Sequence, residues 1–573
     1  MLEAATLPPL ATHVPSRSRS SGDAHEYLRN DDLFRQPVSA GREPVLHRSP
    51  RCDSSSDSGL LIGGLGAHWR TSKVHTTRII DVLDGVHGDL LGSRRNAAIR
   101  ISALASEPRL RDTDNHRTIT SRNFVTQRKN LAILVGGGPA PGINSVISAA
   151  TIRGRLEGVD VVGIRDGFEW IMQGDIEHVT PLTIEGVSRI HFRGGSHIGI
   201  SRANPTTDPA HLENTVISLL RLNVSMLITI GGDDTAFSAL TLQGHAGGRI
   251  HVAHVPKTID NDLGLPPHVD TFGYQTARHY GVEIVKNLMV DAKTTSRWYF
   301  VIAMGRKAGH LALGIGKAAG ATLTLIPEEF GSRRPRLKTV VDTLVGAIIK
   351  RLSYGRRDGV AVIAEGLVLD IDPGDLATST DVERDPHGNI RIAEISIGEI
   401  LKGAVQRRLK EFNLKTTIAA KNIGYELRCA DPIPFDMEYT RDLGYCAAKY
   451  LLSGGSATMI SMQGGHFVPI PFSAFIDPKS GRPHMRLVDI HSTRYAIARR
   501  YMIRIRRDDF EDPHELAKFA ATAGLSLEEF RTQFEYLIED EPPPLVVDRE
   551  HRRLIEAPAV TGAGLRRDDE ASR

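Results

Sequence analysis

This chain has few cysteines and only a small net charge. Only Cys52, Cys429 and Cys446 occur in 573 residues, and none belongs to a CxxC pair, so a disulfide framework is excluded and a reducing cytoplasm is expected. The formal net charge is +3 with acidic and basic residues interleaved, which gives no reason to expect nucleic acid or an anionic membrane as partner. No apolar run approaches the roughly 20 residues that cross a bilayer.

What the chain does have is the composition of a large globular enzyme with more than one domain, with 40% apolar and 24% charged residues. Residues 1–129 differ, because they are rich in Ser, Arg and Pro and show no sustained apolar periodicity. We expect a largely disordered extension there. A leader translated from a start site placed too far upstream is the other interpretation.

From Leu131 onward, apolar strands alternate with segments of helical spacing, which predicts parallel sheets covered by helices. There are too many strands for one compact sheet, so two Rossmann-like three-layer α/β domains facing a cleft are expected. The predicted strands are 131–135, 159–164, 226–230, 251–255, 299–303, 322–326, 360–364 and 457–461. The predicted divisions are a donor-binding domain over 130–275, a sugar-phosphate domain over 276–423, a return segment over 424–487 and a helical appendage with a tail over 488–573. Helices are expected near 512–522 and 526–537.

A glycine block, GGGPAPGIN, follows the first strand from Gly136 to Asn144. A strand that ends in glycines and opens a helix leaves backbone N–H groups free for an anion. The block is neither a GxxxxGK[ST] loop nor a GxGxxG fingerprint, so phosphate binding and a plain tight turn are both open.

A second block, GGDDT, closes the strand at 226–230. Asp233 offers a hard oxygen ligand for Mg²⁺, and Thr235 adds a hydroxyl at the start of the next helix. Taken alone, the block also fits an ordinary turn with an aspartate cap.

A third block, PKTIDND, places Asp260 and Asp262 on a turn directly after the strand at 251–255. Parallel strands would bring these carboxylates near Asp233, which is suitable equipment for phosphoryl transfer under magnesium. Such a reaction asks the protein mainly for alignment and charge neutralisation, and one carboxylate held against an attacking hydroxyl is enough. Two solvated turn carboxylates are the structural alternative.

Together with Met304-Gly305-Arg306, Pro327-Glu328 and the GYELR stretch at 424–428, these blocks resemble, in order and spacing, the 6-phosphofructokinase family over roughly 131–472. The resemblance implies that Asp260 accepts the proton of the fructose 6-phosphate 1-hydroxyl and that Asp233 holds Mg²⁺. It further implies a catalytic set of Asp260, Asp262, Lys257 and Arg306, a donor-binding set of Gly138, Arg202, Asp234, Thr235 and Lys257, and a sugar-binding set of Thr258, Arg297, Met304, Gly305, Arg306, Glu328, Tyr425 and Arg428.

Arg297 matches an arginine that reaches the 6-phosphate of a neighbouring subunit in this family, so the resemblance implies a homo-oligomer, a dimer or tetramer. It also implies a place in glycolysis. The helix after the glycine block carries Ser148 and Ile152 where ATP-using bacterial members have arginines for an allosteric nucleotide, so weak or absent nucleotide regulation is expected.

Asp234 and Lys257 favour pyrophosphate as the phosphoryl donor, because ATP-using bacterial members of the family have glycine at both places. A carboxylate at 234 adds bulk and negative charge where a nucleotide would lie, and Lys257 supplies a compact cation for pyrophosphate. The two could instead form a surface ion pair, worth about 0 to 1 kcal/mol.

The leading hypothesis is therefore a reversible, Mg²⁺-requiring transfer from pyrophosphate to fructose 6-phosphate. ATP as donor is the second hypothesis, and a non-catalytic phosphate-sensing subunit on the same fold is the third.

Overall fold

The chain is described here by a computed structural model, which covers residues 129–331, 335–367, 371–372, 375, 397–477, 479, 483–548 and 553–556. The disorder predicted for 1–129 and most of the predicted tail fall outside the described residues.

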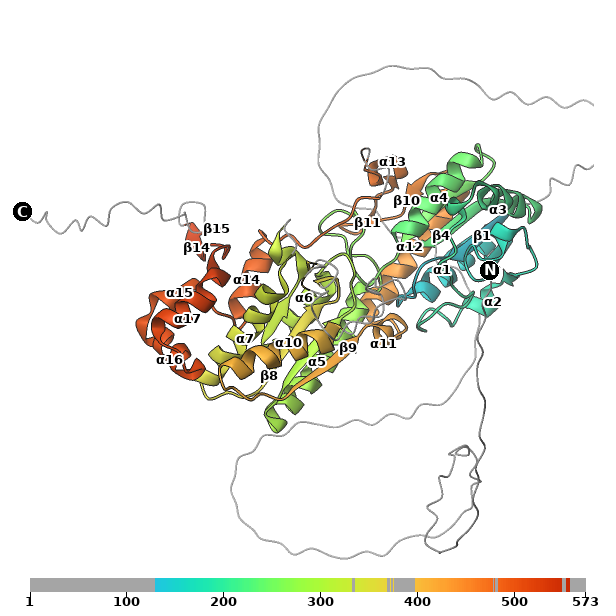
Figure 1. Cartoon of the computed structure of the whole chain (residues 1–573). Coiled ribbons are helices and arrows are strands. Elements are labelled where there is room, and N and C mark those ends of the chain that lie inside the picture. Colours follow the sequence, from blue (N-terminus) through green and yellow to red (C-terminus); the bar gives the residue numbers. More distant parts are fainter. Residues whose placement is uncertain are drawn as a thin grey trace, which may run out of the picture. The chain divides into compact units, whose positions relative to one another are not determined.

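The first sheet has seven strands in the order β13-β10-β5-β4-β1-β2-β3. Figure 1 labels β10, β4 and β1 of this sheet. Its strands are β1 (Asn130–Val135), β2 (Val161–Ile164), β3 (Val179–Leu182), β4 (Val224–Gly231), β5 (His251–Pro256), β10 (Thr458–Met459) and β13 (Ile470–Pro471). The five central strands are parallel, and β3 and β13 pair antiparallel at the two edges.

Strand β1 shows why this sheet is covered on both faces. Leu131 and Ile133 pack with helices α1 (Ile143–Leu156) and α12 (Pro434–Leu452), whereas Ala132 and Leu134 pack with α3 (Pro209–Arg221) and α4 (Asp233–His245). Successive side chains of a strand point to opposite faces, so a continuous apolar run belongs between two helical layers.

The second sheet has four parallel strands in the order β7-β8-β6-β9. They are β6 (Trp298–Ala303), β7 (Leu323–Leu325), β8 (Gly359–Ala364) and β9 (Ile418–Ile423). Helices α5 (Tyr274–Thr295) and α6 (His310–Ala319) pack together against the strands, and so do α7 (Leu337–Ser353) and α10 (Ile397–Glu411). The predicted fold class, an α/β protein with two parallel sheets, is confirmed.

A group of helices follows the second sheet and packs on α7 and α10. Its members are α14 (Thr493–Tyr501), α15 (Arg507–Glu511), α16 (Pro513–Ala523) and α17 (Leu527–Phe534). Asp512 and Ser526 cap α16 and α17 through their side-chain oxygens, which explains why these two helices begin close to where the sequence predicts them.

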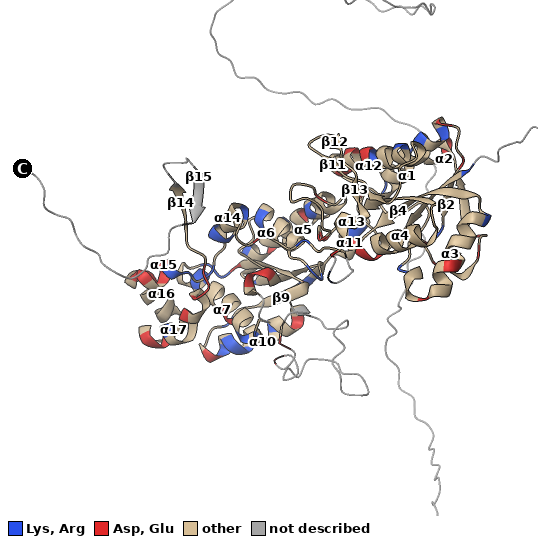
Figure 2. Cartoon of the chain, turned by 90° about the horizontal axis from the view of Figure 1, so that it is seen from above, with Lys and Arg blue, Asp and Glu red and all other residues tan. Residues whose placement is uncertain are grey.

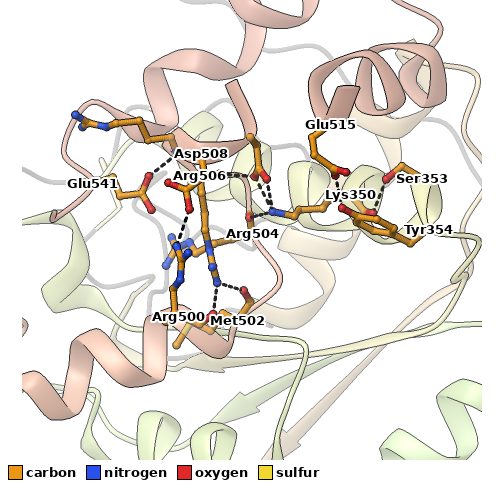
Figure 3. A network of polar contacts seen from close by, with 12 residues as sticks. Lys350, Ser353, Tyr354, Arg500, Met502, Arg504, Arg506, Asp508, Glu515 and Glu541 are labelled. Carbon is orange, nitrogen blue, oxygen red and sulfur yellow. Dashed lines mark hydrogen bonds and ion pairs between the residues drawn. The ribbon is translucent and has the colours of Figure 1, made fainter. Parts of the chain in front are cut away.

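This C-terminal helical group is fixed to α7 by a buried ion pair. Lys350 Nζ lies 2.6 Å and 2.8 Å from the two carboxylate oxygens of Asp509 and also donates to the carbonyl of Arg504 at 3.1 Å (Figure 3). Arg506 donates to the carbonyl of Met502 at 2.6 Å, which folds the chain between α14 and α15 onto itself.

The remaining short helices, 3-10 turns and strands are η1 (Ile171–Gln173), α2 (Ile184–Val187), η2 (Pro205–Thr207), η3 (Pro327–Phe330), α11 (Tyr425–Arg428), β11 (Met462–Gln463), β12 (His466–Phe467), α13 (Phe472–Phe475), η5 (Glu535–Ile538), β14 (Leu545–Asp548) and β15 (Arg553–Glu556).

Charged residues of both signs are mixed on the helices, as Figure 2 shows on α10 and α17. Within the described ranges, no helix is long and apolar enough to span a bilayer.

Candidate active site

A cleft of about 390 Å³ lies where loops from both sheets meet. The loops that follow β1, β4 and β5 of the first sheet and β6, β8 and β9 of the second sheet contribute to it. Ligand sites of open parallel sheets form at the carboxyl ends of the strands, which is the edge used here. The charged side chains in its lining are five cations and five anions, namely Arg202, Lys257, Arg306, Lys307 and Arg428, and Asp233, Asp234, Asp260, Asp262 and Glu365.

The glycine block and the GGDDT block meet on one wall of this cleft. Gly137 has a φ of +83°, a left-handed conformation that favours glycine, and Gly138 lines the cleft beside it. A Cβ on Gly231 would lie 2.3 Å from Thr235, so only glycine allows α4 to begin this close to the end of β4. The sequence therefore needs its glycines here to bring the two loops together.

Lys257 is a buried cation between these loops, with 3% of its surface exposed. Its Nζ donates a hydrogen bond to the carbonyl oxygen of Gly138. Burial lowers the pKa of Lys257 to about 8, although the nearby carboxylate of Asp260 opposes the shift. The amine thus binds to the glycine loop and does not make the surface ion pair with Asp234 considered from the sequence.

The TIDND turn places the carboxylates of Asp260 and Asp262 in the cleft. Thr258 Oγ1 accepts a hydrogen bond from the backbone N–H of Asp260 at 3.0 Å, and Asn261 between the carboxylates has a φ of +56°. Oxygen Oδ1 of Asp260 is buried and has no hydrogen-bond partner within the described part of the chain. Burial and the carboxylate of Asp262 raise the pKa of Asp260, and burial followed by the carboxylate of Asp233 raises that of Asp262.

Two carboxylates that lie close together in the cleft, Asp233 and Asp262, suit Mg²⁺. Mg²⁺ is usually bound by one or two carboxylates together with substrate phosphate oxygens, not by a cage of protein ligands. Asp233 and Asp262 provide the carboxylates, and no larger cluster of three or more His, Cys, Asp or Glu ligands occurs among the described residues. Lys307 Nζ lies 2.6 Å from Asp233 Oδ2 and partly balances this negative charge.

The opposite wall carries residues predicted to hold the sugar phosphate. Met304, Arg306, Tyr425 and Arg428 all line the cleft. The guanidinium carbon of Arg428 lies 4.8 Å from the centre of the Tyr425 ring, and Arg428 Nε is buried without a hydrogen-bond partner. A Cβ on Gly138 would lie 3.0 Å from Arg428 Nη1, so the two walls approach closely at this point.

Three predicted residues are not among those lining the cleft. Gly305 lies between two lining residues and donates its N–H to Glu365 Oε2 at 3.4 Å. Glu328 begins the turn after β7, and its Oε1 accepts hydrogen bonds from the backbone of Gly309 at 2.8 Å and Val488 at 3.0 Å. Arg297 precedes β6 and so lies at the opposite end of that strand, roughly 20 Å away for six residues.

The sequence reasoning missed several lining residues. Lys307 directly follows Arg306, and Glu365 directly follows β8, so the rule that chemistry gathers at the carboxyl ends of parallel strands could have identified both. Asn204 and Ser238, whose side chains are hydrogen-bonded at 3.1 Å, gave no local signal because they belong to different segments.

Comparison with known proteins agrees with this geometry. The phosphofructokinase family model matches residues 130–451. A pyrophosphate–fructose 6-phosphate 1-phosphotransferase of Thermotoga maritima is 52% identical over 411 residues, covering 71% of this chain and 98% of that protein. The protein of the same name from Naegleria fowleri is 47% identical over 430 residues, covering 74% and 98%.

Among solved structures, a pyrophosphate-dependent phosphofructokinase from Nitrosospira multiformis aligns with a TM-score of 0.50 at 16% identity, covering 75% of this chain and 98% of that one. This is a likeness of fold alone. The family match takes in more than half of the sequence, and two relatives are matched over nearly their whole length. The chain therefore belongs to the phosphofructokinase family.

Proposed function

We propose that this protein transfers a phosphoryl group reversibly from inorganic pyrophosphate to the 1-hydroxyl of fructose 6-phosphate. The observation that carries the proposal is the buried, unpaired Oδ1 of Asp260 in a cleft that also holds five cationic side chains. An unpaired buried polar atom is uncommon in folded proteins, and a catalytic role is one explanation for it. The names of the two similar proteins support the same reaction.

In this mechanism Asp260 accepts the proton of the sugar 1-hydroxyl while the oxygen of that hydroxyl bonds to a phosphorus atom of pyrophosphate. The bond between this phosphorus and the bridging oxygen of pyrophosphate breaks. Inorganic phosphate leaves. A loose transition state asks mainly for positioning and charge neutralisation. Lys257, Arg202 and Thr235 bind the donor, whereas Arg306, Tyr425 and Arg428 bind the sugar phosphate.

Asp233, with Asp262 beside it, would hold Mg²⁺, which would neutralise charge on the donor phosphates. The protein's own contribution is to hold Asp233 beside Lys307 and to align Asp260 on the TIDND turn. Chelation of the metal should abolish turnover.

Asp234 is the residue that favours pyrophosphate over ATP. It lines the cleft beside Asp233 and Thr235, so its carboxylate adds negative charge on the donor side. Lys257 donates its hydrogen bond to the glycine loop and does not pair with Asp234. A nucleoside attached to the donor would meet a repelling side chain there.

We further propose that the protein is a cytoplasmic homo-oligomer. Arg297 lies outside the cleft of its own chain, at the far end of β6, which leaves it available to a neighbouring subunit's site. Cys429 and Cys446 are free thiols, as suits a reducing compartment.

The direct test is a coupled assay of fructose 1,6-bisphosphate formation with pyrophosphate and with ATP as donors. Turnover with pyrophosphate that exceeds turnover with ATP supports the proposal. A preference for ATP would refute the donor assignment, and sugar binding without turnover on either donor would favour a phosphate-sensing subunit.

A further inference from the structure

A short stretch beyond the family match contacts both the TIDND turn of the active site and the turn that follows β7. Residues 483–488, called here the spacer segment, run antiparallel to the chain that leaves the TIDND turn, with Met485 opposite Leu263. A Cβ on Gly264 would lie 2.8 Å from the backbone oxygen and the Cβ of His484, so these two segments of the chain approach as closely as glycine allows. The spacer segment is thus packed directly on the turn that carries Asp260.

Arg486 holds this turn through several hydrogen bonds. Its backbone N–H donates to the carbonyl of Asp262 at 2.8 Å, and its guanidinium donates to the backbone carbonyl of Asn261 at 3.1 Å and also to the Asn261 side-chain oxygen. The same guanidinium donates to the carbonyls of Pro266 at 3.1 Å and Val269 at 2.7 Å. Asn261 lies between Asp260 and Asp262, so Arg486 grips the turn at its centre.

Two residues later the same segment contacts the second sheet. The N–H of Val488 donates to Glu328 Oε1 at 3.0 Å, and His310 Nε2 donates to the carbonyl of Arg486 at 3.2 Å. His310 begins α6 and Glu328 follows β7, so both belong to the second sheet and the elements packed on it, although neither lines the cleft. Burial lowers the pKa of His310 to about 4, which keeps the ring neutral as such a donor.

The sugar-side contact is itself firmly supported. Glu329, adjacent to Glu328, is buried and pairs with Arg504 at 2.7 Å and Arg499 at 3.3 Å. The remaining oxygen of Glu328, Oε2, is buried and has no hydrogen-bond partner. One oxygen of Glu328 is therefore held by the protein, whereas the other stays unsatisfied.

We infer that Arg486 and Val488 are positioning residues that set the separation between the base Asp260 and the sugar-binding Glu328. The inference rests on the role proposed for Asp260 and on the sugar-binding role that the family resemblance implies for Glu328. Arg486 holds the TIDND turn and Val488 holds Glu328, and only Leu487 lies between these two residues. A displacement of about 1 Å between reacting groups can cost about 10²-fold in rate, so a rigid link of this kind bears directly on turnover.

The guanidinium fork is essential to this role, because it donates in several directions at once and lysine cannot. Arg486→Met removes the fork but keeps an unbranched side chain, and Arg486→Lys keeps the charge. The matched control is Leu487→Ala, which changes the residue between the two positioning residues, whose side chain is 52% exposed.

Steady-state kinetics in the full-length enzyme, with pyrophosphate and fructose 6-phosphate varied, tests the first end. In Arg486→Met we expect kcat to fall about 30- to 100-fold, and in Arg486→Lys about 10-fold or more, while the KM for fructose 6-phosphate changes less than about threefold. Leu487→Ala should match the parent in both constants. Parent-like kcat in Arg486→Lys would overturn the inference, and this milder variant serves if Arg486→Met does not fold.

Val488→Pro tests the second end by removing the N–H that holds Glu328. We expect the KM for fructose 6-phosphate to rise about 10-fold with kcat within about threefold of the parent, the reverse of the Arg486 pattern. Calorimetric titration with fructose 6-phosphate should show the same loss of affinity. Equal changes of kcat and KM in both variants, or a thermal transition that falls in proportion to the lost activity, would mean a purely structural segment. A parent enzyme inactive with pyrophosphate would instead refute the proposed function.

Discussion

Buried charges in the C-terminal helical group and in the cleft are treated in opposite ways. Asp509 on α15 has both carboxylate oxygens paired with Lys350. On α7, on which this group packs, the fully buried Asp342 accepts from Arg408 at 2.9 Å and from Tyr536 at 2.8 Å. In the cleft, Asp260 Oδ1 has no hydrogen-bond partner among the residues that the structure describes. A buried charge is costly unless it is paired, so the first region is built for stability and the second is kept ready for a ligand.

This contrast separates stability from activity and can be tested residue by residue. Substitution of a side chain that lacks protein partners should lower activity and leave the free energy of unfolding unchanged. Substitution of a paired side chain should lower the free energy of unfolding and change activity little.

Asp260→Asn should give the largest effect on turnover. Loss of the proposed base should lower kcat by about 10² to 10⁴-fold, while fructose 6-phosphate binding measured by calorimetry stays nearly the same. The pKa of Asp260 is raised in the folded state. The group therefore contributes its full stabilisation at pH values below its pKa in the unfolded chain, and this contribution is lost as the pH rises through its pKa in the folded protein. At neutral pH the variant should therefore melt at the same or a higher temperature, and a clearly lower melting temperature would contradict the contrast.

Lys350→Met should produce the opposite result. It leaves Asp509 buried without its cation, and removal of one partner of a buried pair costs about 3 to 5 kcal/mol of unfolding free energy. Urea denaturation measures this loss, and kcat per folded molecule should stay within about twofold of the parent. The double variant Lys350→Met/Asp509→Leu is the control, since it removes both charges and should recover much of the lost stability.

Asp234→Gly should change the choice of donor. Removing the carboxylate relieves repulsion of a nucleotide, so the ratio of kcat/KM for ATP to that for pyrophosphate should rise about 10-fold or more, equivalent to about 1.4 kcal/mol. The variant Asp234→Asn separates charge from bulk. An unchanged ratio in both variants would show that residue 234 does not face the donor.

Glu365→Gln should give the smallest effect, a shift in pH dependence. Burial first, then Asp262 and Glu365, raise the pKa of Asp260, and the base works only when deprotonated. Removing the charge of Glu365 should move the acid limb of kcat/KM to lower pH by less than about one unit. A limb that stays in place, or moves to higher pH, would argue against Asp260 as the titrating base.

Short contiguous blocks made most of the site predictable. Asp233, Asp260 and Lys257 follow strands that an apolar pattern reveals, and parallel strands must bring their carboxyl ends together, so their meeting could be expected from the sequence. Lys307 and Glu365 were within reach of the same rule and were missed. Arg486 was not, because nothing local marks an arginine more than 220 residues beyond Asn261 as its partner.

By itself, the sequence determined the α/β class, the positions of most of the central strands and the chemistry of the glycine and aspartate loops, since periodicity and turn composition act over a few residues. Only the tertiary structure decided which buried charges are paired and which are left open. That outcome depends on contacts between distant segments, such as Lys350 with Asp509 or Val488 with Glu328, and on the burial that makes each missing partner costly.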